Sequence, residues 1–122
     1  MIIRDDISPS NYDGIENNYP AVFLYPDTVD PGSGCAATLI NSGYAVTAAH
    51  CFDDISTPFT VAIGGVQHTV STVLLNPCFS FDYDGPNGMD LALIKLDTPS
   101  YVSPINIYTE SDEVGKIITL VG

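Results

Sequence analysis

The chain has 122 residues, a length typical of one domain. Three basic residues stand against fifteen acidic ones, so the formal net charge is −12. Nucleic acids and anionic membranes require clustered Lys and Arg, so this charge argues against both as partners. Hydrophobic residues make up 45% of the chain and charged residues only 15%, which indicates a packed globular protein and argues against disorder.

Neither a membrane span nor a leader is predicted. No apolar run approaches the roughly 20 residues that cross a bilayer, and the start, MIIRDDISPS, lacks the basic residues and apolar centre of a signal peptide. The low content of Lys and Arg favours an extracellular protein that negative charge keeps soluble.

Residues 1–19 are polar and rich in turn formers, and they predict an irregular N-terminal arm. Short apolar stretches rich in Val, Ile, Thr, Tyr and Phe follow it. They fit strands better than helices, because a helix would need a 3.6-residue apolar stripe over ten or more residues. In chain order the predicted strands cover 21–25, 36–40, 44–49, 59–63, 68–75, 91–96, 105–108 and 116–121.

Turn signals lie between these stretches at intervals typical of an all-β, mainly antiparallel barrel or sandwich. In 68–75 polar residues interrupt the apolar ones, as in a strand with one face in water. The small residues of AVTAAHCFDD, 45–54, allow close backbone packing, and its Ala-Ala-His-Cys segment is able to form a single helical turn. His68 is interpreted as a strand residue near a hairpin.

Cys35, Cys51 and Cys78 make an odd number of cysteines. One disulfide plus a leftover thiol is the simplest interpretation, and in an oxidising compartment the leftover would have a partner outside this chain. Zinc binding is the alternative, but the sequence has neither a C-x-x-C nor an H-x-x-x-H spacing. No metal or other cofactor is therefore expected.

Two titratable residues are candidates for catalysis. A histidine that acts as general base needs a carboxylate to fix its tautomer, and a nucleophile to deprotonate. His50 is the candidate base. Asp90 is the candidate carboxylate, because it directly precedes Leu91–Lys95, a run expected to be largely buried strand that draws the acid partly out of water. The competing interpretations are a packed or surface histidine and a turn-forming aspartate.

The segments around both residues resemble the trypsin-like (chymotrypsin-fold) serine endopeptidases, over about residues 18–122. GSGCAATLINSGYAVTAAHCF is similar to the family segment in which a Cys-containing strand and a hairpin lead to T-A-A-H-C with the catalytic histidine. MDLALIKLDTP is similar to the D-I-A-L-[IL]-[KR]-L segment that starts with the catalytic aspartate. YPAVFLY resembles the first barrel strand, and EVGKIITLVG resembles the strand before the W-G that opens the second half.

This resemblance implies that 20–122 form a six-stranded antiparallel Greek-key barrel, the first of the family's two barrels. It also implies that His50 is the general base, that Asp90 orients it, and that Cys35 pairs with Cys51 at the base of the catalytic turn. Proteins of this family are secreted and hydrolyse peptide bonds of protein or peptide substrates through a His-Asp-Ser triad.

The family's G-D-S-G-G segment, which carries the nucleophilic serine, does not occur in the sequence. Ser42, Ser56 and Ser80 lack that context and are expected to be turn or surface residues. We therefore expect the N-terminal half of a protease, inactive without its second barrel. The alternative is a non-catalytic homologue that acts as a binding or regulatory module, although such a protein would have no chemical reason to keep both His50 and Asp90.

The segment DYDGPNGMD, 82–90, crowds three aspartates among glycines, as a calcium loop does. Counted from Asp82, the EF-hand pattern requires glycine at the sixth position and glutamate at the twelfth, where Asn87 and Leu93 stand. We therefore expect a polar loop that leads into Asp90 and holds no calcium.

Overall fold

The computed structural model describes residues 8, 15–25, 34–80 and 89–121. Most of the predicted N-terminal arm, and the loop at 82–88, lie outside the described residues. The elements are two 3₁₀ helices, η2 (Ile15–Asn18) and η3 (Ala49–Phe52), and six strands, β1 (Val22–Tyr25), β2 (Cys35–Asn41), β3 (Tyr44–Thr47), β4 (Phe59–Ile63), β5 (Val66–Leu75) and β6 (Ala92–Leu96). Six of the eight predicted strands are therefore confirmed, as is the helical turn after β3.

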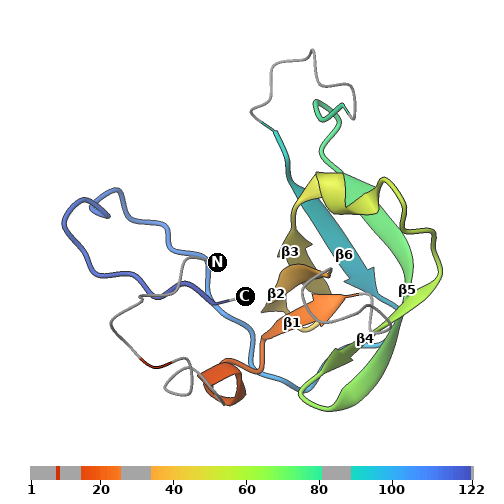
Figure 1. Ribbon diagram of the computed structural model, residues 1–122, viewed down its shortest axis with the longest axis horizontal. Coiled ribbons are helices and arrows are strands. Elements are labelled where there is room, and N and C mark those ends of the chain that lie inside the picture. Colours follow the sequence, from red (N-terminus) through yellow and green to blue (C-terminus); the bar gives the residue numbers. More distant parts are fainter. Residues whose placement is uncertain (1–7, 9–14, 26–33, 81–88, 122) are drawn as a thin grey trace.

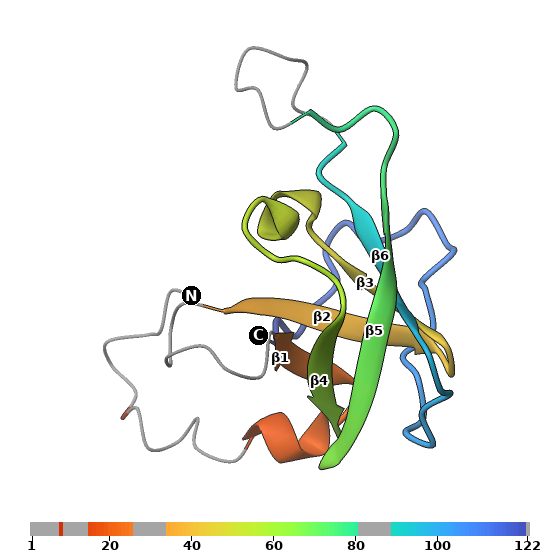
Figure 2. The ribbon, with the colours of Figure 1, turned by 90° about the vertical axis from the view of Figure 1, so that its right-hand side faces the viewer.

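The six strands form one antiparallel sheet in the order β1-β2-β3-β6-β5-β4. The edge strands β1 and β4 pack against each other, which nearly closes the sheet into a barrel (Figures 1 and 2). The step from β3 to β6 places the last strand between two hairpins, which is the Greek-key arrangement. The prediction of an all-β, six-stranded antiparallel Greek-key barrel is confirmed.

Side chains along each strand alternate between the barrel interior and the solvent. In β5 His68 and Val70 are buried, whereas Thr69 and Ser71 are exposed. The inward-facing side chains fill the core by themselves, with no helix or second sheet of the described chain packed on that face, because the barrel is narrow enough for them to meet at its axis. The core consists of Ala21, Phe23, Tyr25, Ala37, Leu39, Ala45, Val61, Ile63, Val70, Ile94 and Leu96.

A bulge in β5 bends the long strand where it crosses from β4 to β6. The register with β6 shifts between Val70 and Thr72. The Asp97 carboxylate accepts hydrogen bonds from the Ser71 backbone N–H at 3.2 Å and from its hydroxyl at 2.6 Å. The loop after β6 thereby satisfies the backbone group that the bulge releases from the ladder.

The run Leu91–Lys95 is not continuously buried, which corrects the prediction made for it. The strand begins at Ala92, and its residues alternate, with Ala92 and Ile94 buried and Lys95 exposed. Leu91 precedes the strand and is 49% exposed. The physical reason is that one face of β6 meets water, so only every second residue reaches the core.

The predicted strands at 105–108 and 116–121 are wrong. Residues 97–121 form no strand, and in both ribbon views this blue stretch runs outside the barrel (Figures 1 and 2). A strand gains its stability from pairing, and in the described chain the backbone of this stretch contributes only isolated bonds to the barrel, such as Ile105 N–H to the Leu39 carbonyl at 2.9 Å. Among the described residues, no helix is both long and apolar enough to cross a membrane.

Candidate active site

The pairing of β3 with β6 brings the two candidate catalytic residues together. Thr47, the last residue of β3, lies opposite Ala92, the first residue of β6. In an antiparallel pair, the chain that leaves one strand and the chain that enters the other emerge at the same end. His50 and Asp90 are 40 residues apart in sequence and therefore meet just beyond this pair.

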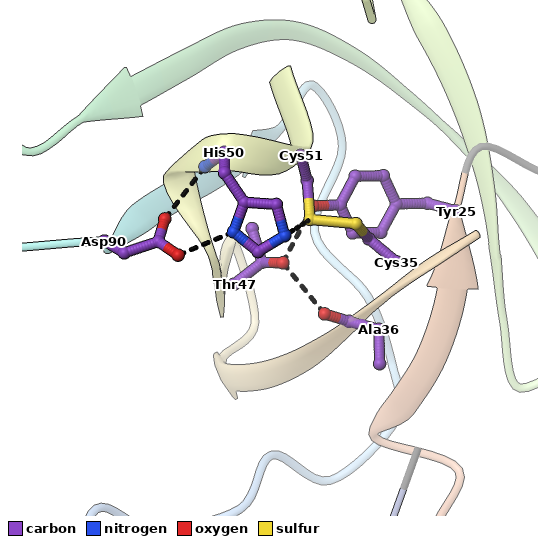
Figure 3. Close-up of polar contacts among 7 residues, drawn as sticks. All are labelled: Tyr25, Cys35, Ala36, Thr47, His50, Cys51 and Asp90. Carbon is purple, nitrogen blue, oxygen red and sulfur yellow. Dashed lines mark hydrogen bonds and ion pairs between the residues drawn. A yellow bond between two sulfur atoms is a disulfide. The ribbon is translucent and has the colours of Figure 1, made fainter. Parts of the chain in front are cut away.

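The carboxylate of Asp90 holds His50 at two points (Figure 3). Its Oδ2 lies 2.6 Å from the imidazole Nδ1, and its Oδ1 accepts a hydrogen bond from the His50 backbone N–H at 2.8 Å. The second bond also satisfies a free N–H in the first turn of η3, where Ala48 at the N-cap offers no side-chain acceptor. One carboxylate thus fixes both the ring and the backbone that carries it.

These hydrogen bonds favour the ionised form of Asp90 and select one tautomer of His50. The bond from the His50 ring, followed by the bond from the His50 backbone N–H, holds the pKa of Asp90 below its ordinary value. The ionised carboxylate only accepts hydrogen bonds, so in the neutral imidazole Nδ1 of His50 carries the proton and Nε2 keeps a free lone pair. This is the tautomer that a general base needs.

The pair is more open to solvent than the sequence predicts. The His50 side chain is 65% exposed and that of Asp90 41% exposed. Met89 and Leu91, the neighbours of Asp90 on either side, are 48% and 49% exposed, so the carboxylate is only partly shielded from water. Solvent therefore reaches both side chains from outside the barrel.

A disulfide anchors the turn that carries His50. Cys35, the first residue of β2, is bonded to Cys51 in η3, with their Cα atoms 6.3 Å apart. Both half-cystines pack against the core, and Sγ of Cys51 lies 3.8 Å from Nε2 of His50. The imidazole therefore lies between the Asp90 carboxylate and the disulfide (Figure 3).

A buried hydrogen-bond chain below the turn was not evident from the sequence. Thr47 donates its hydroxyl proton to the Ala36 carbonyl at 2.8 Å, so the Tyr25 hydroxyl, 2.7 Å away, donates to the Thr47 oxygen (Figure 3). Burial raises the pKa of Tyr25, which keeps this donor neutral. The Tyr25 ring also stacks on Phe52. The only sequence signal is a large polar aromatic at an inward strand position.

The other residues singled out in the sequence lie elsewhere. Ser42, Ser56 and Ser80 are exposed residues outside the strands, as predicted. Cys78 is exposed and has no disulfide partner among the described residues. His68 lies in β5 just after the β4–β5 turn, as predicted, and its Nδ1 is 3.2 Å from the Thr98 carbonyl oxygen.

Comparison with known proteins gives one consistent result. The family model described as Trypsin matches residues 12–122. The thrombin-like enzyme BjussuSP-1 of Bothrops jararacussu is 31% identical over 119 residues, which cover 87% of this chain and 48% of that protein. Venom serine protease 34 of Apis mellifera is 28% identical over 95 residues, which cover 66% of this chain and 24% of that protein. The chain thus spans about a quarter to a half of the length of these relatives.

Solved structures show the same fold. The VesB protease of Vibrio cholerae superposes with a TM-score of 0.59 at 24% identity, over 75% of this chain and 31% of that one. Neuropsin, a serine protease of mouse brain, superposes with a TM-score of 0.55 at 19% identity, over 70% of this chain and 40% of that one.

Proposed function

Because the chain belongs to the trypsin family of serine proteases, we propose that it contributes the base and the orienting acid of a peptide-bond hydrolase. His50 is the proposed general base and Asp90 its partner. The observation that carries this proposal is the two-point hold of Asp90 on the ring and the backbone of His50. A turn-forming aspartate bonds to backbone groups close to it in sequence, whereas Asp90 bonds to a histidine 40 residues away.

In the proposed reaction His50 Nε2 takes the proton of a serine hydroxyl as the oxygen attacks the substrate carbonyl. The same nitrogen then gives that proton to the leaving amine. Between these steps the imidazolium keeps both ring protons, and the ionised Asp90 stabilises its positive charge without itself becoming protonated.

We propose that the serine and the oxyanion-binding amides come from a second barrel, carried by polypeptide beyond residues 1–122. The partial coverage of the relatives supports this, as do exposed apolar side chains after β6. Val114 and Ile117 are fully exposed in the described structure, which is an unusual state for large apolar groups that cluster along one stretch. Without that second barrel the chain would have no serine to form a covalent intermediate. It would also have no amides to stabilise the negative charge that develops on the substrate oxygen in the transition state.

The substrates would be proteins or peptides, and the site of action extracellular. The disulfide between Cys35 and Cys51 supports this, because structural disulfides form and persist mainly in oxidising compartments. The names of several relatives, which describe venom proteases, also favour secretion.

The proposal is tested in the full-length protein. His50→Ala should lower kcat/KM for a peptide substrate by several orders of magnitude, and Asp90→Asn by about 10⁴, because the tautomer would no longer be fixed. Asp53→Asn is the matched control, since Asp53 is an exposed acid three residues after His50. Unchanged turnover in His50→Ala would reject the assigned role.

The coding sequence downstream of Gly122 distinguishes the enzyme from the alternative, a non-catalytic homologue. A G-D-S-G-G segment supports the enzyme. A substituted serine in an otherwise intact second barrel would instead support a binding or regulatory module that retains His50 and Asp90 for structure alone.

A further inference from the structure

Tyr25 contacts the segment that carries His50 from β1, a strand that pairs with neither β3 nor β6. It is the last residue of β1, and its side chain is fully buried. Its hydroxyl lies 2.7 Å from Oγ1 of Thr47, where β3 ends (Figure 3). Its ring stacks on Phe52, where η3 ends, with 5.6 Å between the ring centroids. One side chain therefore holds both ends of the segment 47–52.

We propose that Tyr25 is a positioning residue, which fixes the His50 imidazole against Asp90 by holding both ends of that segment. This inference rests on the proposed role of His50 as the general base. Tyr25 is enclosed in the core and has no exposed surface with which to touch a substrate. Its effect on His50 is transmitted through Thr47 at one end and Phe52 at the other.

The hydroxyl of Tyr25 fixes the end of β3. Thr47 donates its own proton to the Ala36 carbonyl in β2 at 2.8 Å, so the bond from Tyr25 ties Thr47 to a second neighbouring strand. Thr47 is also paired with the first residue of β6, which lies two residues after Asp90. His50 lies three residues after Thr47. A displacement of Thr47 would therefore disturb both members of the pair.

The ring of Tyr25 fixes the other end of the segment. Phe52 and Phe59 both stack on it, at 5.6 and 5.9 Å between ring centroids. In the register of β1 and β2 Tyr25 is paired with Cys35, which is bonded to Cys51 in η3. Aromatic rings in such arrangements pack with a preferred geometry. The ring contact and the disulfide therefore hold η3 at adjacent residues.

A tyrosine supplies both contacts from one inward position of β1. A phenylalanine there would keep the stacking on Phe52 and lose the bond to Thr47, and a leucine would lose both. Burial raises the pKa of Tyr25, and the negative charge of Asp90 adds to the rise. The hydroxyl therefore keeps its proton and continues to donate to Thr47. Substitution by phenylalanine and by leucine removes the two contacts in succession.

The ring ¹⁵N shifts of His50 test the proposal in the 122-residue chain without any substrate. They are measured through the carbon-bound ring protons, at a pH above the ordinary range of histidine titration. In the parent the shifts of Nδ1 and Nε2 should differ widely, because the bond to Asp90 selects one tautomer. Tyr25→Phe should move the two shifts toward each other, and Tyr25→Leu should move them further, as the second tautomer becomes populated.

Tyr44→Phe is the matched control. Tyr44 is partly buried and is the first residue of β3, at the opposite end of the strand from Thr47. Its substitution removes a tyrosine hydroxyl from the same strand and should leave both His50 shifts unchanged. Urea denaturation confirms that each variant is folded, and Tyr25→Phe decides the outcome if Tyr25→Leu does not fold. The proposal is overturned if folded Tyr25→Phe keeps the shifts of the parent, or if Tyr44→Phe moves them equally.

Turnover of the full-length protein provides the second measurement. A misplacement of about 1 Å costs roughly 100-fold in rate, so kcat should fall by about 10-fold in Tyr25→Phe and about 100-fold in Tyr25→Leu. KM should stay constant, because Tyr25 touches no substrate. A raised KM at constant kcat would contradict the positioning role. Failure of the proposed function would appear separately, as unchanged turnover in His50→Ala, and the ring shifts do not depend on that result.

Discussion

At the scale of single residues, the site depends on how one carboxylate is shared. Asp90 uses one oxygen for the His50 ring and the other for the His50 backbone N–H. Orientation of the imidazole therefore does not rely on burial, which is low for both side chains. The same contacts lower the pKa of Asp90, the ring contact most strongly.

The Asp90 pKa gives a testable pH dependence. A carboxylate whose pKa is lowered in the folded state stabilises the fold above its unfolded pKa, near 3.9, and loses that contribution as the pH falls through the folded value. In a ¹³C NMR titration, Asp90 should titrate below the ordinary aspartate range. His50→Ala should raise its midpoint toward that range, because both the ring contact and its charge are removed.

Asp112 is the internal control for that titration. Its pKa is also lowered, by hydrogen bonds from Lys116 and then Tyr108, and neither donor contacts His50. Its midpoint should stay the same in His50→Ala. Equal movement of Asp90 and Asp112, or no movement of Asp90, would contradict the assignment of the shift to His50.

At the scale of elements, hairpins and register determine which residues meet. β4 and β5 are joined by the two-residue turn Gly64–Gly65, with Ile63 paired to Val66. Both glycines have positive φ, +58° and +80°, as a tight hairpin turn of the favoured twist requires. This turn starts β5 in the register that places His68 and Val70 in the core.

The two glycines allow strain and crowding to be separated. A Cβ on Gly64 would lie 2.6 Å from Cγ2 of Val102, whereas a Cβ on Gly65 would meet nothing within 4 Å. Gly65→Ala should cost about 1 to 2 kcal/mol of unfolding free energy from the left-handed backbone alone. Gly64→Ala should cost more, because the new Cβ also collides with Val102. Adding Val102→Ala to Gly64→Ala should recover part of this extra cost.

Urea denaturation measures these costs in Gly65→Ala, Gly64→Ala, Val102→Ala and the double variant Gly64→Ala/Val102→Ala. The double variant matters most, because relief by Val102→Ala distinguishes a clash with that side chain from backbone strain. Equal losses for the two glycine variants would show that the C-terminal stretch does not pack on this turn as described.

At the scale of the whole molecule, a disulfide cross-links the nearly closed barrel at the end that bears the site. The disulfide links the start of β2 to the turn after β3 and closes a loop with a sequence separation of 16 residues. A cross-link of this length restricts the unfolded chain more than the folded one. It therefore stabilises the entire fold as well as the turn that carries His50.

Removing the cross-link should lower global stability. The double variant Cys35→Ala/Cys51→Ala should lose about 3 kcal/mol of unfolding free energy, the amount that loop closure predicts for about 15 residues. Urea denaturation measures it, with Cys78→Ala as the control because Cys78 is exposed and outside any disulfide among the described residues. A loss confined to the control level would mean that the disulfide contributes only local order.

How much of this could be predicted from sequence differs between segments. The sequence predicts the strand at 59–63 with the bounds that the structure has, because its β-branched and aromatic residues and the glycines after it all indicate a strand and a turn. The segment 116–121 has an equally strong apolar pattern but forms no strand. Local pattern reports the preference of a segment, whereas a strand also requires a neighbour with which to pair.

The sequence by itself determined the barrel, through alternating short apolar stretches, and identified His50, Asp90 and the cysteine pair through the motifs around them. Only the tertiary structure decided that Asp90 binds His50 at two points, that the pair is open to solvent, and that Nε2 lies 3.8 Å from Sγ of Cys51. The physical reason is that alternation and motifs are local properties of the chain. Distances between residues 40 positions apart depend instead on the register of β3 against β6.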